Sequence, residues 1–146
     1  MNFRIRKALF GLAGLLLLGG LSGCAMDQLI NPPAKQGEKA LEEFIRALRL
    51  EEYQAAASHL APEYRQDFLD TFNPLKKDLT IIDVRIEEIT LIEEGKQADV
   101  ALEMEYFLLP SASVKTFLFN QTWVYYEARE KEPAFYQVET PFPPFP

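Results

Sequence analysis

The 146-residue sequence has little of what builds metal centres, disulfides and nucleophilic active sites. It contains one cysteine, Cys24, and one histidine, His59. A single thiol excludes an internal disulfide, and the three or four soft ligands of a structural metal site cannot be assembled. His59 directly follows Ser58, and adjacent helical residues do not face one another. The sequence therefore predicts no metal, no cofactor and no catalytic residue.

Glycine is also scarce outside the N-terminal segment. Five of the seven glycines lie within residues 8–23, which leaves Gly37 and Gly95 for the rest of the chain. A glycine-rich loop that cradles phosphate through backbone N–H groups is therefore absent. The acidic pairs Glu87-Glu88 and Glu93-Glu94 could hold calcium loosely, but neither lies in a loop with the required ligand spacing.

Basic side chains are outnumbered, and more so once the first 23 residues are set aside. That segment holds Arg4, Arg6 and Lys7 and no acidic residue, so the remainder has 12 basic and 22 acidic side chains, a formal charge of −10. A domain this acidic repels phosphate backbones and anionic headgroups. We therefore expect no nucleic-acid partner and no peripheral electrostatic binding to membranes, and the charge serves solubility.

Residues 1–23 have the layout of a secretory signal peptide, with a basic start followed by an uncharged run over residues 8–23. These 16 residues fall short of the ~20 that span a bilayer, so a permanent transmembrane helix is the weaker interpretation. The run leads into Leu21, Ser22, Gly23 and Cys24. These four residues match the lipobox at every position, and the segment resembles a bacterial lipoprotein signal. An ordinary secretory signal with a chance cysteine is the alternative.

This resemblance implies a lipid anchor. Cleavage between Gly23 and Cys24 would leave a cysteine that carries a diacylglyceryl group on its sulfur and an N-acyl group on its new amino terminus. Two or three acyl chains hold a protein lastingly on a membrane, since each buried CH₂ contributes ~0.8 kcal/mol. Ala25, rather than aspartate, follows the cysteine, which implies the outer membrane, facing the periplasm. Residues 24–34 are predicted to form a short lipidated tether.

Helical periodicity predicts about three helices from residue 35 onward. The first carries an apolar stripe at positions i, i+3, i+4 and i+7, formed by Leu41, Phe44, Ile45 and Leu48. A second, alanine-rich helix is expected over residues 52–60. The third begins at Pro62 and runs to about Phe72, because proline suits a first helical turn and Asn73-Pro74 stops the helix.

After Pro74 the period becomes alternating, which predicts a first strand with Ile82, Val84 and Ile86 on its inner face. The phase slips at Glu87-Glu88, where we expect a bulge, and alternation resumes at Ile89 and Leu91. A hairpin turn follows over residues 93–96, with Gly95 at a position that favours positive φ.

The second predicted strand has alternating inner positions at Ala98, Val100, Leu102, Met104 and Tyr106. Its outer positions are acidic and are predicted to face solvent: Asp99, Glu103 and Glu105. A third strand over residues 114–127 is apolar on both faces, so both are expected to be partly covered. A fourth strand is expected over residues 135–140, followed by a Pro/Phe-rich tail, residues 141–146, in an extended conformation outside the sheet.

This order of elements predicts an α+β fold in which about three helices pack on a curved four-stranded antiparallel sheet. It resembles the nuclear-transport-factor-two-like superfamily of cone-shaped domains, over residues 35–140. The resemblance rests on the element order and on a loose motif typical of small bacterial members: Phe44, Ala47, Leu48, Tyr53 and Ala56, with Trp123 on a late strand. A cystatin-like arrangement of helix on sheet is the competing fold.

The resemblance implies a pocket, because relatives of this fold include isomerases and dehydratases with a carboxylate base and a tyrosine in the cone. No acidic residue occupies a clear inner strand position here. An aromatic set either lines an apolar pocket or fills the core: Tyr53, Tyr64, Tyr106, Phe117, Phe119, Trp123 and Tyr125. The tail would cover the pocket mouth, dock on a neighbouring protein or remain disordered.

We therefore predict a periplasmic lipoprotein that binds a small apolar ligand or an envelope protein without catalysis. An isomerase-like or dehydratase-like enzyme is the alternative. An enclosed cavity with a buried carboxylate in hydrogen-bond reach of a tyrosine would favour the enzyme, whereas a filled cone would favour the binding module.

Overall fold

The computed structural model describes residues 32–146, which form one unit. The predicted signal peptide, the lipobox with Cys24 and tether residues 24–31 lie outside the described residues. The helical elements and strands follow in this order: α1 (Pro32–Arg49), α2 (Tyr53–Ser58), α3 (Pro62–Phe72), η2 (Asn73–Leu75), β1 (Leu79–Ile92), η3 (Glu93–Gly95), β2 (Gln97–Leu108), β3 (Lys115–Tyr126) and β4 (Phe135–Val138). The predicted α+β class, with three α-helices and four antiparallel strands, is confirmed.

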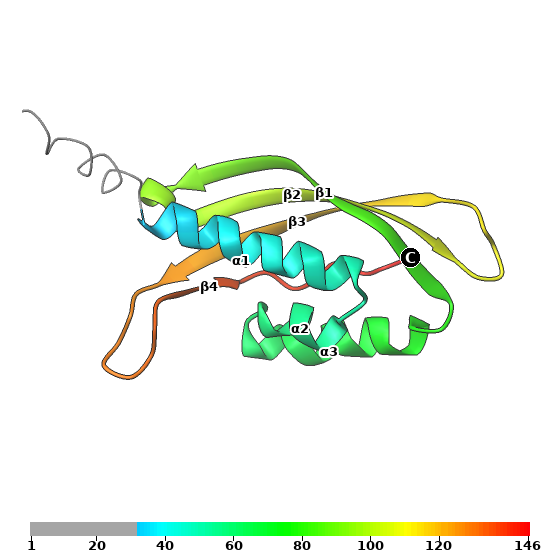
Figure 1. Ribbon diagram of the computed structural model, residues 1–146, viewed down its shortest axis with the longest axis horizontal. Helices are drawn as coiled ribbons and strands as arrows, with labels where there is room; N and C mark the ends of the chain where they lie inside the picture. The colour runs from blue at the N-terminus through cyan, green and yellow to red at the C-terminus, as the bar shows by residue number, and fades with distance from the viewer. Residues whose placement is uncertain (1–31) are drawn as a thin grey trace, which may run out of the picture. The chain divides into compact units, whose positions relative to one another are not determined.

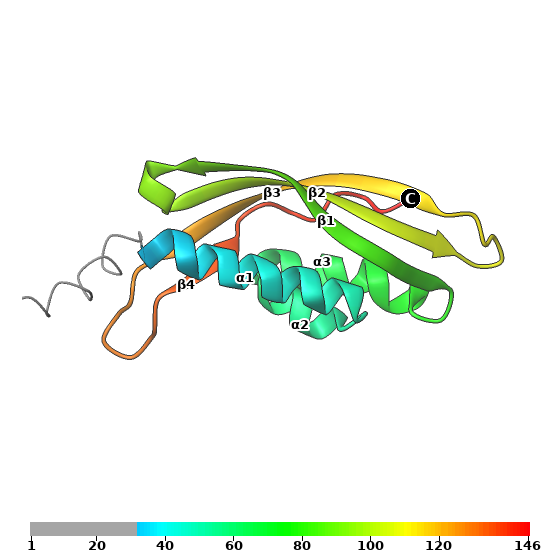
Figure 2. The same ribbon diagram turned by 45° about the horizontal axis from the view of Figure 1, so that its top comes forward.

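The four strands pair in chain order, β1-β2-β3-β4, each antiparallel to the next. Figures 1 and 2 show this sheet curving around α1, with α2 and α3 beside the C-terminal end of that helix. The core lies between the helices and the concave face of the sheet. No helix within residues 32–146 is long and apolar enough to cross a bilayer.

The predicted stripe of α1 forms its buried face, since Leu41, Phe44, Ile45 and Leu48 are all less than a tenth exposed. The helix begins at Pro32, three residues before the predicted start, because Pro32 and Pro33 fit a first turn whose N–H groups have no helical acceptor. Further along, Gly37 lies against the ring of Tyr136, where an added Cβ would come within 2.9 Å of Cζ.

Local signals set the ends of α3, whereas tertiary contacts set the end of α2. The third helix has its predicted limits, Pro62 and Phe72. The second ends at Ser58, two residues early, because the next backbone groups pair with β4: Val138 N–H donates to the His59 carbonyl (2.8 Å) and Ala61 N–H donates to the Val138 carbonyl (2.9 Å).

The face assignment of β1 needs a correction. Val84 is buried as predicted, and Ile86 shares its face by pairing with the buried Leu102 although it is 40% exposed, whereas Ile82 is 46% exposed. A register shift between Ile81 and Asp83 leaves Ile82 as an extra residue, so Ile81 takes the inner position instead. The bulge predicted near Glu87-Glu88 is confirmed by the second shift, between Ile86 and Glu88.

The remaining strands follow the predicted alternation more closely. All five predicted inner residues of β2 are buried. The turn before this strand has positive φ at Glu93, Glu94 and Gly95, and this agrees with the predicted hairpin. On β3 the outer face is unevenly covered, because Leu118 is 66% exposed whereas Tyr126 stacks on Phe135.

Candidate functional site

The seven aromatic residues predicted to line a pocket are distributed over the helical layer, the sheet and the place where the tail lies. Tyr53 stacks on Phe72 of α3, with ring centroids 5.1 Å apart. Tyr125 lies 5.3 Å from Tyr136 of β4. Four of the set are buried and three are half-buried: respectively Tyr53, Tyr106, Phe119 and Trp123, and Tyr64, Phe117 and Tyr125.

The tail, residues 141–146, enters the aromatic interior. We call its receptor site the tail seat, which α3, β2 and β3 form together: Phe68, Phe72, Tyr106, Phe117 and Phe119. Phe142 lies 4.9 Å from Phe119 and 5.2 Å from Phe68 between ring centroids. Phe145 lies 4.8 Å from Tyr106. Residues 141–146 thus pack among Tyr106, Phe117 and Phe119, three of the aromatic side chains predicted to line a pocket or fill the core.

The spacing of the tail explains this fit. An extended polyproline helix has three residues per turn, so Phe142 and Phe145 project to the same side. Ring contacts hold the segment, since no hydrogen bond within the described residues joins residues 141–146 to the rest. The pattern Pro-Phe-Pro-Pro-Phe-Pro was the signal that could have identified this segment as part of the core.

Trp123 occupies a second cluster, beneath α1. Its ring lies 5.7 Å from Phe44 and 6.0 Å from His59. Its Nε1 donates to Oε1 of the buried Gln121 at 3.2 Å, while Gln121 Nε2 has no partner in the described part of the chain. Burial lowers the pKa of His59, and the charge of Glu43 opposes this shift only in part. A neutral imidazole that packs on two rings acts here as an apolar side chain.

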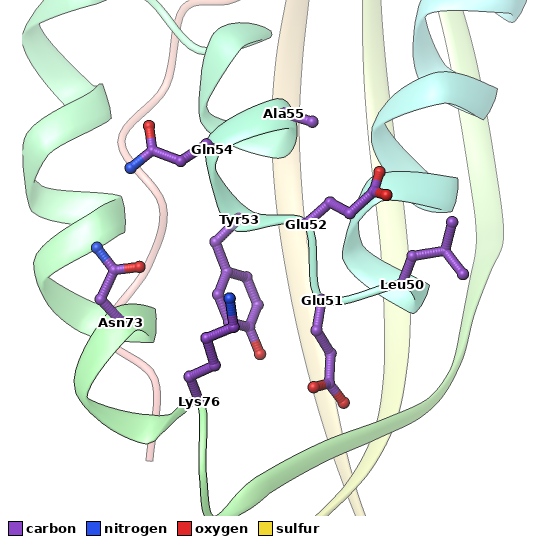
Figure 3. A pocket seen from close by; sticks show the side chains of 8 residues that line it. All are labelled: Leu50, Glu51, Glu52, Tyr53, Gln54, Ala55, Asn73 and Lys76. Carbon is purple, nitrogen blue, oxygen red and sulfur yellow. The ribbon is translucent and has the colours of Figure 1, made fainter.

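A shallow hollow of about 430 Å³ opens where α1 meets α2, and Figure 3 shows the side chains around it. Its lining mixes charged, amide and apolar groups: Leu50, Glu51, Glu52, Tyr53, Gln54, Ala55, Asn73 and Lys76. Tyr53 is the one predicted residue there. Its hydroxyl is buried without a partner among the described residues, and burial, with the nearby Glu51 carboxylate, raises its pKa to about 12.

The predicted outer carboxylates lie on the convex face of the sheet. Arg85 of β1 bridges Glu103 and Glu105 of β2, the second at 2.9 Å, and their hydrogen bonds raise the pKa of Arg85. Asp99 accepts from the hydroxyl of Thr122 at 2.9 Å. Among residues 32–146 the buried polar side chains are the glutamines at 121 and 137, and no cluster of potential ligands is placed to hold a metal ion.

The two edges of the sheet differ. Beyond β4, the chain between α2 and α3 pairs in parallel with that strand through a Leu60–Val138 bridge. Along β1, the first half is covered: Arg49 Nη2 donates to the Val84 carbonyl at 2.7 Å and pairs with Asp83 at 2.7 Å. The second half of β1, residues 86–92, extends past these contacts. Sequence reasoning missed this bare edge, because alternation alone does not show which strand a covering helix leaves exposed.

Comparison with known proteins places this domain by its fold. No family model matches the chain, and no curated protein sequence matches it significantly. A SEC-C motif-containing protein from Psychrobacter arcticus matches with a TM-score of 0.57 at 13% identity, covering 74% of this chain and 60% of that one. The chain therefore spans less than two thirds of that relative.

Two further solved structures match over most of their length. A ketosteroid isomerase-like protein from Erwinia carotovora atroseptica has a TM-score of 0.51 at 10% identity, covering 77% of this chain and 100% of that one. The Agrobacterium tumefaciens VirB8 protein has a TM-score of 0.51 at 13% identity, covering 74% and 89%. At such identities the likeness concerns the fold alone. The domain thus has solved neighbours of the nuclear-transport-factor-two-like fold, which supports the fold predicted from its element order.

Proposed function

We propose that this protein is a lipid-anchored module of the bacterial envelope that acts by binding another envelope protein, without catalysis. Cys24 is the proposed acylation site, and Ala25 after it assigns the protein to the periplasmic side of the outer membrane. Seven residues lie between Cys24 and the start of α1, a span of at most roughly 30 Å. The tether therefore keeps the start of the domain close to the membrane surface.

One observation carries this proposal: the interior of the cone is occupied by the protein itself. Phe142 and Phe145 fill the tail seat, and Trp123 and Phe44 fill the space beneath α1. The carboxylates of β2 lie on the opposite face of the sheet, away from Tyr53 and Tyr106. A closed interior leaves the outer surface as the place where binding occurs.

A small apolar ligand is the second candidate. The tail is held by ring contacts, each worth ~0.5–1.5 kcal/mol beyond burial, and without backbone hydrogen bonds in the described residues. A ligand that replaces Phe142 and Phe145 would find five aromatic side chains around it. Mass spectrometry of lipids and small molecules extracted from purified protein tests this candidate, and wild-type protein should yield none in stoichiometric amount.

The anchor is tested by mass spectrometry of the protein purified from membranes. The expected mass is that of a chain beginning at Cys24 plus its acyl groups. A Cys24→Ala variant should lose both the added mass and the membrane fraction. An unmodified soluble wild-type protein, or a Cys24→Ala variant that stays in the membrane, would contradict the anchor.

The partner is tested by photo-crosslinking in native membranes, with a crosslinking residue placed at several exposed positions of the full chain. We expect a discrete protein adduct from at least one surface position, with none from buried Phe72. Lack of a protein adduct from every surface position would contradict the proposed function.

A further inference from the structure

The second half of β1 presents backbone groups that no part of the described chain covers. The backbone groups of Val84 point away from β2, because its N–H donates to the Asp83 carboxylate and its C=O accepts from Arg49. The partner of Val84 on β2 is Met104. Ile86, Ile89 and Leu91 pair with every second residue of β2 from there, namely Leu102, Val100 and Ala98. Antiparallel pairs alternate between bonded and non-bonded, so these three residues also direct their backbone groups outward.

The same three residues form an apolar floor beside this edge. They share a face with the buried Leu102, Val100 and Ala98, yet Ile86, Ile89 and Leu91 are 40%, 46% and 57% exposed. A free strand edge flanked by apolar side chains is the geometry that receives an added strand.

Acidic side chains border this floor on the strand and in the turn that follows it. Glu87 and Glu88 are exposed on the strand itself, and Glu93 follows in the turn. Glu38 and Glu42 lie on the same side of α1 as Arg49, at helical spacings of eleven and seven, but Lys35 and Arg46 share that side, so its charge is mixed. Glu87, Glu88 and Glu93 therefore form an acidic rim beside the apolar floor.

We infer that residues 86–92 of β1 are a docking edge for an extended segment of a partner protein in which basic and apolar side chains alternate. This inference rests on the proposed function and names the partner's chemistry. Backbone pairing would supply register, and the alternation would place apolar side chains on the floor and cations beside the acidic rim. A second copy of this chain fits less well, because pairing of two β1 edges would bring the Glu87 and Glu88 carboxylates of both copies into one interface without any cation from either edge.

The test uses the full lipidated protein in phospholipid nanodiscs and a fluorescent heptapeptide that alternates lysine and valine. Two comparison peptides replace lysine by glutamate, or the central valine by proline. The lysine–valine peptide should bind at least tenfold more tightly than either, and it should slow amide hydrogen exchange at Ile89 and Leu91. Equal binding of the proline peptide would overturn the inference, because it would reveal non-specific attraction of charge.

Variants locate the site. Ile89→Lys with Leu91→Lys should weaken peptide binding at least tenfold, and Glu87→Gln with Glu88→Gln should weaken it about three- to tenfold. Leu118→Lys is the matched control, since Leu118 is similarly exposed on the convex face, and it should bind within twofold of the wild type. Undiminished binding by the Ile89/Leu91 variant, or self-association through β1, would overturn the inference.

The peptide-binding test of the docking edge and the crosslinking test of the proposed function can fail independently. If membrane crosslinks arise from another surface while the peptide fails to bind, the docking edge is wrong and the binding module survives. If no surface position crosslinks to a protein, the proposed function fails whatever the peptide does.

Discussion

The interior of this domain and the second half of β1 are built from the same kinds of apolar residue, but only the interior is covered. Val84 and Leu102 are fully buried beneath the helices. Ile89 and Leu91, on the same face of the sheet a few residues along, are about half exposed. The comparison shows that coverage, rather than composition, separates a core position from a surface available to a partner. Substitutions should therefore cost stability in the interior and binding at the edge.

The largest expected effect is in the interior. Phe72 is fully buried and contacts Tyr53, Phe68 and both tail rings. Phe72→Ala should lower the free energy of unfolding by about 3–5 kcal/mol, because it leaves a cavity among these rings. Urea denaturation measures this, with the exposed Leu118→Ala as a control expected within about 0.5 kcal/mol. A cost below about 1 kcal/mol for Phe72→Ala would show that the interior is loosely packed.

The tail should give the next largest effect. Phe142→Ala with Phe145→Ala removes two half-buried rings, and we expect roughly 2–3 kcal/mol of destabilisation in the same assay. The two losses should not add fully, since both rings contact Phe72 and Phe117. Pro144→Ala, at an exposed position between them, is the control. An unchanged unfolding curve for the double variant would place the tail outside the core and favour an open seat for ligands.

Tyr53 should make stability depend on alkaline pH. Its pKa is raised from 10.0 to about 12, so the folded state holds this proton more tightly than the unfolded state. The stability that this proton contributes is fully present below pH 10 and is lost as pH rises from 10 to 12. The loss is about 2 kcal/mol, because one proton is involved. Urea titrations should show that the free energy of unfolding of wild type and of Tyr53→Phe changes equally with pH near pH 8. Above pH 10 that of the wild type should fall more steeply. Parallel pH profiles would show that the Tyr53 hydroxyl is hydrated.

The edge should give the smallest effect on stability. Ile89→Lys with Leu91→Lys should change the free energy of unfolding by no more than about 0.5 kcal/mol per site, because neither side chain is covered. The matched Leu118→Lys variant should behave alike in urea. A loss above 2 kcal/mol for the edge variant alone would make these residues part of the core and remove the contrast with the interior.

Much of the fold could be predicted from local signals in the sequence. Pro62 and Asn73-Pro74 fixed the limits of α3, and the regular alternation of β2 identified all its buried residues. The stripe of α1 likewise predicted its buried face. These features succeed because proline geometry and periodicity act within a few residues.

The remaining features depend on contacts between distant segments. The shift between Ile81 and Asp83 carries no glycine or proline signal, so the inner face of β1 was wrongly assigned to Ile82. The end of α2 is determined by Val138 of β4, and the exposure of Ile89 by the position of α1. At the candidate site, the sequence grouped seven aromatic residues into one set, but the contacts that each of them makes depend on where the tail and the helices lie, which local patterns do not show.

The most direct test of the central claim is a paired photo-crosslinking measurement in native membranes. The crosslinking residue replaces Leu91 on the β1 edge in one variant and Leu118 on the convex face in the other, two positions of similar exposure. We predict a discrete protein adduct from position 91 and none from position 118. An adduct from position 118 alone, or from neither position, would contradict it.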